Sequence, residues 1–193
     1  LALSYSSRRE ISLALKKRHL QVEECGQPFK TRGELIHKFM ELLKFDLTKA
    51  QKKVLGEIMH YLEKNEPMNL LLQGDVGSGK TVVALISLLT GVDNDCQTAL
   101  MAPTELLAEQ HFLSIRPFCE ALNITIALVT SSGTAKEKSL LHSSISNGTT
   151  QIIIGTHALI QKKIEFSKLG LIVVDEQHRF GVLKRDALSK KGL

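Results

Sequence analysis

Short apolar runs alternate with longer segments of helical periodicity over most of this chain. Each apolar run has the length of a strand and is almost free of charged residues. The predicted strands are residues 68–72, 97–102, 124–129, 151–154 and 169–174. The predicted helices between them are residues 81–89, 104–119 and 134–146. This alternation predicts an α/β fold in which helices cover both faces of a parallel sheet.

The first part of the chain differs from this pattern, because it is basic and its periodicity is helical. Residues 8–20 predict a basic amphipathic helix. Residues 21–30 contain a Gly and a Pro and predict a linker. We therefore expect a helical N-terminal extension over residues 1–43 and a main domain over residues 44–193.

Capping boxes mark the start of several predicted helices, since a Thr and a Glu or Gln three residues later can each bond the other's backbone N–H. The pairs are Thr31 with Glu34, Thr48 with Gln51, and Thr134 with Glu137. The first pair predicts a helix that continues to residue 43, and the second predicts one that ends near residue 64. Pro117 predicts that the helix over residues 104–119 is interrupted or ends there.

The charges are distributed unevenly along the chain, which has a net charge of +5. Residues 1–53 carry 12 Lys and Arg against 6 Asp and Glu, and residues 179–193 carry 5 against 1. Residues 54–178 carry 8 against 13. Basic ends around an acidic middle suit a polyanion partner such as nucleic acid. Solvated helix faces are the alternative interpretation of the same charges.

Composition narrows the setting of the protein. No apolar run approaches the length that spans a bilayer, so we expect no membrane association. The three cysteines are far apart, which argues against a metal or redox pair and fits a reducing, cytoplasmic location. The chain has no signal-peptide layout and does not begin with Met, so we expect it to be a piece of a longer protein.

One motif predicts a phosphate-binding loop between the first predicted strand of the sheet and the helix that follows it. The pattern is G-x-x-x-x-G-K-[ST], formed by Gly74, Asp75, Val76, Gly77, Ser78, Gly79, Lys80 and Thr81. Glycines let the backbone N–H groups converge on an anion at a helix N-terminus. Lys80 would reach the β- and γ-phosphates, and Thr81 would offer its hydroxyl to Mg²⁺. A chance match is the alternative, but the flanking strand and helix favour a site for ATP and Mg²⁺.

A second motif completes this site at the end of the last predicted strand. Asp175 and Glu176 directly follow the apolar run, in the Walker B pattern. Asp175 would hold the Mg²⁺ shell, and Glu176 would orient the attacking water. Two carboxylates at a strand end can also be a plain polar terminus, and the upstream loop is what favours catalysis. The same carboxyl edge of the sheet would carry the segments at residues 103–104 and 155–157.

The motifs together resemble a known family. Asp175-Glu176-Gln177-His178 is a DExH/DExQ-type box. With GDVGSGKT (residues 74–81), MAPTELLAEQH (101–111), IIIGTHALIQ (152–161) and VVDEQHRFGV (173–182), the chain resembles the RecG family of superfamily 2 DNA helicases, strongly from about residue 30 onward. Mfd-like translocases, which act with RNA polymerase, are the alternative. Their box usually has a second Glu where Gln177 stands.

The resemblance assigns further roles to individual residues. It implies the first RecA-like domain of a helicase, in which Gln51 reads the adenine edge; a plain capping role is the alternative. It implies DNA contacts by Pro103, Thr104, Gly155, Thr156 and His157, and coupling of the ATP site to DNA by Gln177 and His178. The chain departs from the family at Ser131, where a glycine usually lets the backbone approach DNA. This departure weakens the case for DNA contact at that loop.

The resemblance also implies partners. The parent protein would act on branched double-stranded DNA, such as replication forks and Holliday junctions, in recombination and repair. A wedge domain would precede this segment. A second RecA-like domain would follow it and supply an arginine finger. We expect the isolated segment to be weakly active or inactive, because an arginine finger contributes several orders of magnitude to turnover in related enzymes.

Overall fold

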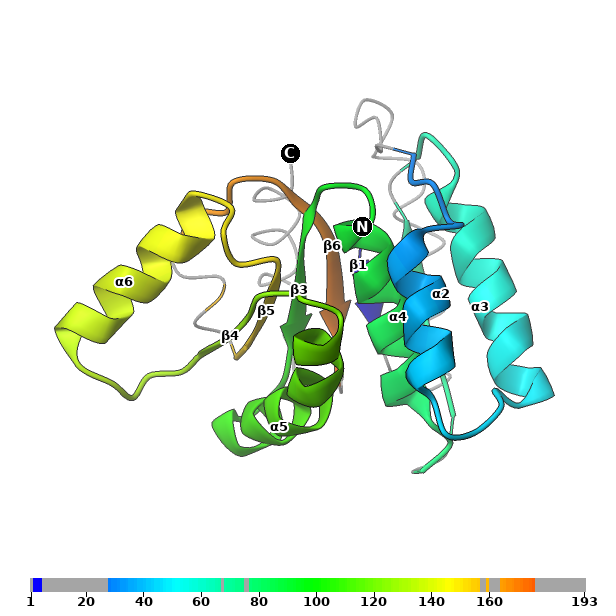
Figure 1. Cartoon of the computed structure of the whole chain (residues 1–193), viewed down its shortest axis with the longest axis horizontal. Coiled ribbons are helices and arrows are strands. Elements are labelled where there is room, and N and C mark those ends of the chain that lie inside the picture. The colour runs from blue at the N-terminus through cyan, green and yellow to red at the C-terminus, as the bar shows by residue number, and fades with distance from the viewer. Residues whose placement is uncertain are drawn as a thin grey trace, which may run out of the picture.

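The computed structural model describes residues 2–4, 28–66, 68–74, 77–156, 159 and 164–175 (Figure 1). The helix predicted over residues 8–20 lies outside these ranges. So do six of the predicted site residues, namely Asp75, Val76, His157, Glu176, Gln177 and His178.

A six-stranded sheet forms the centre of the described part of the chain, in the order β2-β1-β6-β3-β5-β4. All neighbouring strands pair in parallel. The strands are β1 (Ala2–Ser4), β2 (Asn69–Leu71), β3 (Gln97–Met101), β4 (Ile126–Val129), β5 (Ile152–Gly155) and β6 (Leu169–Val174). The predicted α/β class and all five predicted strands are thereby confirmed. The sequence did not predict β1, which pairs with both β2 and β6.

Helices cover both faces of the sheet, as the alternating pattern predicted. They are α2 (Glu34–Leu42), α3 (Lys49–Leu62), α4 (Lys80–Val92), α5 (Glu105–Ala121) and α6 (Ala135–Ser146). Successive residues of a strand point to opposite faces. In β6, Leu171 and Val173 join the larger core beneath α2 to α5, while Ile172 and Val174 join a smaller core with Ile145 of α6. Figure 1 shows α2, α3 and α4 grouped at one side and α6 at the other.

Helix α2 packs on the rest of the domain. Its Phe39 is fully buried in the larger core, and the helix lies against α4. Elements from both sides of residue 43 therefore share one core. The division into an extension and a main domain at that residue stays a prediction.

The predicted capping box at Thr31 and Glu34 is wrong. Gly33 is the N-cap of α2, which begins at Glu34, and the Thr31 hydroxyl donates to Glu63 instead. The cap comes from the end of α4, where Asp93 Oδ1 accepts from the Leu35 N–H at 3.2 Å. A Cβ at position 33 would lie 1.8 Å from Asp93 Oδ2, so this approach requires glycine. Burial raises the pKa of the Asp93 carboxyl above its ordinary value.

The other two capping boxes are confirmed. Thr48 with Gln51 caps α3, and Thr134 with Glu137 caps α6. Pro117, in contrast, neither interrupts nor ends its helix, since α5 continues to Ala121. The N–H that proline lacks would have bonded the carbonyl of Leu113. That turn of α5 faces solvent, with Leu113 67% exposed, so water can satisfy the carbonyl.

One buried polar side chain ties several distant segments together. Gln97, at the start of β3, is 4% exposed. Its Nε2 donates to the carbonyls of Ile145 (2.9 Å) and Thr150 (2.7 Å). Its Oε1 accepts from the N–H groups of Ser167 (2.7 Å) and Lys168 (3.2 Å). Every polar atom of this amide has a partner, as burial of such a group requires.

Candidate nucleotide-binding site

Two glycines in the described part of the loop between β2 and α4, residues 72–74 and 77–79, have backbone conformations that occur in anion nests. Gly77 and Gly79 have φ angles of 79° and 76°, a region that side chains strongly disfavour. A Cβ at Gly74 would lie 2.9 Å from Ser78 Oγ, so a side chain there would require the Ser78 hydroxyl to rotate away. Gly79 is the N-cap of α4 and offers no side chain to the first helical N–H groups. These groups and the helix dipole are therefore directed at whatever anion the loop holds.

Lys80 supplies the positive charge of the loop. It is the first residue of α4 and is half-buried. Its Nζ donates to the Gly74 carbonyl at 2.9 Å and approaches Ser78 Oγ at 3.5 Å, so the ammonium lies across the loop. Thr81, also half-buried, follows in the first turn of α4. The two side chains predicted to hold phosphate and metal thus stand together at one helix N-terminus.

Gln51 connects the cap of α3 to this loop. Its Oε1 accepts from the Thr48 N–H at 2.9 Å, as the capping box requires. Its Nε2 donates to the Ser78 carbonyl at 3.0 Å and lies 2.2 Å from where a Cβ of residue 79 would be. The oxygen of the Gln51 amide therefore caps α3, while its nitrogen binds the phosphate-binding loop. Contact of Gln51 with adenine stays a prediction.

The replacement of Gln51 by Glu separates these two roles. Glu keeps the oxygen that caps α3, so we expect the melting temperature to change little. Glu cannot donate to the Ser78 carbonyl and would repel it, so we expect affinity for labelled ADP to fall about tenfold, the equivalent of one lost hydrogen bond. Titration and thermal melting of the full-length parent protein measure both effects.

Gln51→Ala is the matched control for this substitution, because it removes both contacts and should lower the melting temperature as well as the affinity. Unchanged ADP affinity in Gln51→Glu would contradict a role in holding the loop. The ratio of ATP to GTP affinity tests the adenine contact in the same variants, because only base recognition makes that ratio fall.

The carboxylate predicted to bind Mg²⁺ lies at the end of β6. The Asp175 N–H donates to the Met101 carbonyl at 2.8 Å, which holds the backbone beside β3. Asp175 Oδ2 lies 2.8 Å from His111 Nε2, on α5. These side chains are 20% and 17% exposed, respectively. The sequence analysis did not identify His111, because nothing in the local pattern indicates a contact across 64 residues.

The residues predicted to contact DNA have structural roles of their own. Thr104 is the N-cap of α5, and its side chain accepts from the Leu107 N–H at 3.3 Å. Gly155 ends β5, where a Cβ would lie 2.7 Å from the Val129 carbonyl. Thr156 directly follows β5, and Pro103 comes two residues after the end of β3. In the sheet, β3 pairs with both β6 and β5. The carboxyl edge therefore brings Thr104, Thr156 and Asp175 to one side, while the DNA contacts stay predictions.

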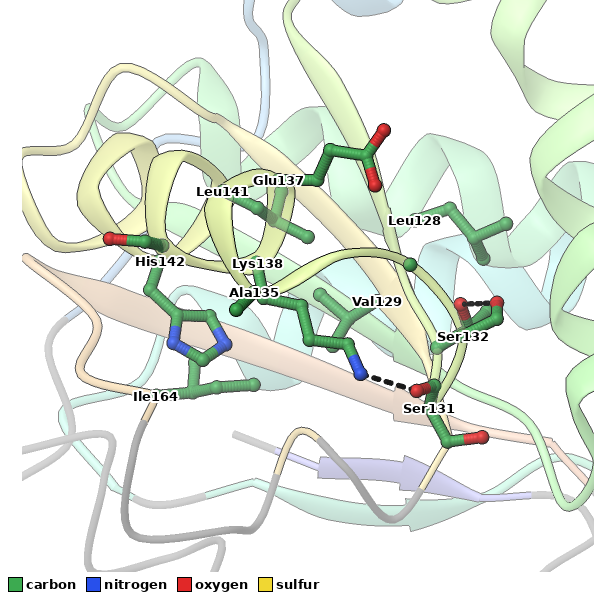
Figure 2. Close-up of a pocket in the computed structure, with 13 residues that line it drawn as sticks. Leu128, Val129, Ser131, Ser132, Ala135, Glu137, Lys138, Leu141, His142 and Ile164 are labelled. Carbon is green, nitrogen blue, oxygen red and sulfur yellow. Dashed lines mark hydrogen bonds between the residues drawn. The ribbon is translucent and has the colours of Figure 1, made fainter.

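The loop after β4 borders a cavity of about 640 Å³ between that strand and α6 (Figure 2). The Ser131 N–H donates to Glu105 Oε1 at 2.6 Å, and Lys138 donates to the Ser131 carbonyl. The bonds from Ser131 lower the pKa of the Glu105 carboxyl. The Ser131 amide, at the position where the family usually has glycine, is therefore bonded to a carboxylate of the same chain.

The described residues fit a magnesium nucleotide better than a metal held by protein alone. Among them, no group of three or more His, Cys, Asp and Glu residues could hold a metal ion. Mg²⁺ in phosphoryl-transfer sites is usually bound by one or two carboxylates together with the substrate phosphates. Asp175 and Thr81 suit that arrangement.

No helix in the described ranges is long and apolar enough to cross a membrane.

Comparison with known proteins gives the family. The DEAD/DEAH box helicase family matches residues 48–191. The chain belongs to this helicase family. The helicase domain implies use of a nucleotide, in agreement with the loop at residues 74–81.

Individual helicases agree with the resemblance drawn from the motifs. The chain is 48% identical over 179 residues to the ATP-dependent DNA helicase RecG of Synechocystis, covering 92% of this chain and 22% of that protein. It is 44% identical over 191 residues to RecG of Thermotoga maritima, covering 98% and 24%. The chain thus spans about a quarter of the length of these helicases. They confirm the resemblance to RecG, and they favour it over the Mfd alternative.

Solved helicase structures agree with the fold. A structure of RecG bound to a three-way DNA junction matches with a TM-score of 0.77 and 44% identity, covering 86% of this chain and 23% of that one. The UvsW helicase of bacteriophage T4 matches with a TM-score of 0.58 and 15% identity, covering 93% and 64%. The latter likeness concerns the fold alone.

Proposed function

We propose that this chain is the ATP-binding segment of a longer RecG-like DNA helicase that acts on branched DNA, such as replication forks and Holliday junctions, in recombination and repair. The observation that carries the proposal is the placement of Lys80 and Thr81 at a glycine-lined helix N-terminus, in a chain 48% identical to a RecG helicase. The parent would work in the cytoplasm, with a second RecA-like domain and a wedge domain in the same chain.

Each residue has a proposed task in ATP hydrolysis. The nest at residues 74–79 and the Lys80 ammonium bind the phosphates and neutralise charge on the γ-phosphoryl group. Thr81 and Asp175 would hold Mg²⁺, which would neutralise negative charge on the phosphates. Glu176 orients the attacking water, and Gln51 contacts the adenine. Catalysis on this proposal is mainly positioning and charge stabilisation.

The DNA-facing part of the proposal uses the carboxyl edge of the sheet. Thr104 lies at the N-terminus of α5, where backbone N–H groups can receive a DNA phosphate. Pro103, Gly155, Thr156 and His157 would extend that contact. Gln177 and His178 would couple it to the nucleotide. The isolated segment would bind nucleotide weakly and turn over little, since the arginine finger belongs to the second domain.

ATP turnover by the full-length parent protein tests this function. It is measured with no DNA, with linear duplex and with a model fork of the same length. We expect strong stimulation by the fork and little by linear duplex. Equal stimulation by both would indicate that the substrate is duplex DNA in general, as for an Mfd-like translocase, and not branched DNA. No stimulation by any DNA would overturn the nucleic-acid motor and leave an ATPase.

A further inference from the structure

His111 and Asp175 form an ion pair between segments that are 64 residues apart in the chain. Three other ion pairs of the described residues, His37–Glu41, Lys38–Glu34 and Arg116–Glu120, each join residues four apart on one helix and are mostly exposed. The His111–Asp175 pair is four-fifths buried, with 2.8 Å between Nε2 and Oδ2. Because Asp175 is the carboxylate proposed to bind Mg²⁺, we infer that this pair has a role in metal binding and does not only stabilise the fold.

The contact constrains the orientation of the carboxylate. An ionised Asp accepts hydrogen bonds only, so His111 donates from Nε2 to Oδ2. That bond limits rotation of the carboxyl group and leaves Oδ1 for a metal ligand. Partners of ligating carboxylates act in this way in many metal sites, and their loss weakens metal binding about 10- to 100-fold.

Helix α5, which carries His111, also carries the candidate DNA-phosphate site at its N-terminus. His111 lies seven residues after Thr104, about 10 Å along α5 at 1.5 Å per residue. The first residue of the same helix, Glu105, holds the Ser131 loop. A single rigid helix thus joins the candidate DNA-phosphate site at its N-terminus to the metal carboxylate at its second turn.

We propose that His111 is a positioning residue that holds Asp175 in the orientation that binds Mg²⁺ and, through α5, connects that orientation to DNA binding at Thr104. The positioning of Asp175 rests on the nucleotide-binding part of the proposed function, and the connection to DNA rests on its DNA-binding part. His111 touches no reacting atom in this proposal, and it acts only through the carboxylate.

The test measures the Mg²⁺ dependence of fluorescent ADP binding by the full-length protein, without DNA. In His111→Ala we expect the half-saturating Mg²⁺ concentration to rise about tenfold, while ADP affinity in EDTA stays unchanged. The amide nitrogen of Gln reaches about as far as Nε2 of His. In His111→Gln we therefore expect the half-saturating Mg²⁺ concentration to lie within about threefold of the wild-type value. An unchanged Mg²⁺ dependence in His111→Ala would overturn the proposal.

His37→Ala is the matched control, because His37 pairs with Glu41 at 3.4 Å on the exposed face of α2. It should leave the Mg²⁺ dependence unchanged. If His111→Ala does not fold, His111→Asn replaces it, since Asn is too short to reach Oδ2. Equal Mg²⁺ dependence in the Asn and Gln variants would then overturn the proposal, and a shift in Asn alone would support it.

The same variants separate this proposal from the function. With a fork, we expect His111→Ala to lose most of the DNA stimulation of kcat, and His111→Gln to regain it. If wild-type protein shows no stimulation by any DNA, the proposed function fails while the Mg²⁺ measurement still decides the role of His111. If stimulation stays intact in His111→Ala despite the Mg²⁺ shift, the connection through α5 is overturned.

Discussion

Replacing Lys80 with alanine should reduce ATP turnover by the full-length protein by at least about 100-fold, the cost of one charge-stabilising donor in a preorganised site. The Lys80 Nζ donates to the Gly74 carbonyl at 2.9 Å, so the ammonium lies across the loop that we propose binds phosphate. Alanine removes the only side-chain cation that the described part of this loop carries. The measurement is steady-state phosphate release at saturating fork DNA.

A control separates this loss from unfolding. Lys38→Ala makes the same chemical change on α2, where Lys38 forms an exposed pair with Glu34 at 2.7 Å. It should keep wild-type turnover, and both variants should melt within a few degrees of wild type. Turnover by Lys80→Ala within threefold of wild type would show that the loop does not act on the γ-phosphate.

Phe39→Ala should lower the free energy of unfolding of this chain by about 3–5 kcal/mol, the usual cost of truncating a buried aromatic ring. Phe39 is fully buried, and its ring meets Phe118 of α5 edge-to-face, with centroids 5.2 Å apart. The cavity left behind would lie between α2 and the rest of the larger core. Urea unfolding followed by circular dichroism measures the change.

This substitution also tests the division at residue 43. Met40→Ala, next along α2 and 37% exposed, is the control and should cost less than about 1 kcal/mol. If α2 belongs to the domain, Phe39→Ala shifts the single main transition. A main transition that stays in place, with a separate early loss of helix, would place α2 in an extension that unfolds by itself.

Local patterns predicted most of the secondary structure, and the errors have physical causes. Thr48 and Thr134 cap their helices as predicted, because a capping box involves only residues three apart. Thr31 fails because Asp93, 58 residues from Leu35 in the chain, caps α2 instead. β1 was missed because a three-residue strand carries too little pattern to be distinguished from a loop.

In the candidate site, too, some features follow from local sequence and others only from the fold. The sequence by itself determined the glycine-lined loop, Lys80, Thr81 and the carboxylate of Asp175. Each depends on its neighbours in the chain and on the rule that ligands bind at the carboxyl ends of parallel strands. Pattern alone could name these residues because their chemistry requires a particular side chain at a particular spacing.

Only the tertiary structure decided how these parts are held. Gln51 meets the Ser78 carbonyl across 27 residues, and His111 meets Asp175 across 64. Gln97 satisfies carbonyls and N–H groups from segments about 50 and 70 residues away. Such contacts form because a buried polar group must find a partner wherever the packed chain provides one. The identity of that partner is a property of the fold, and no local spacing records it.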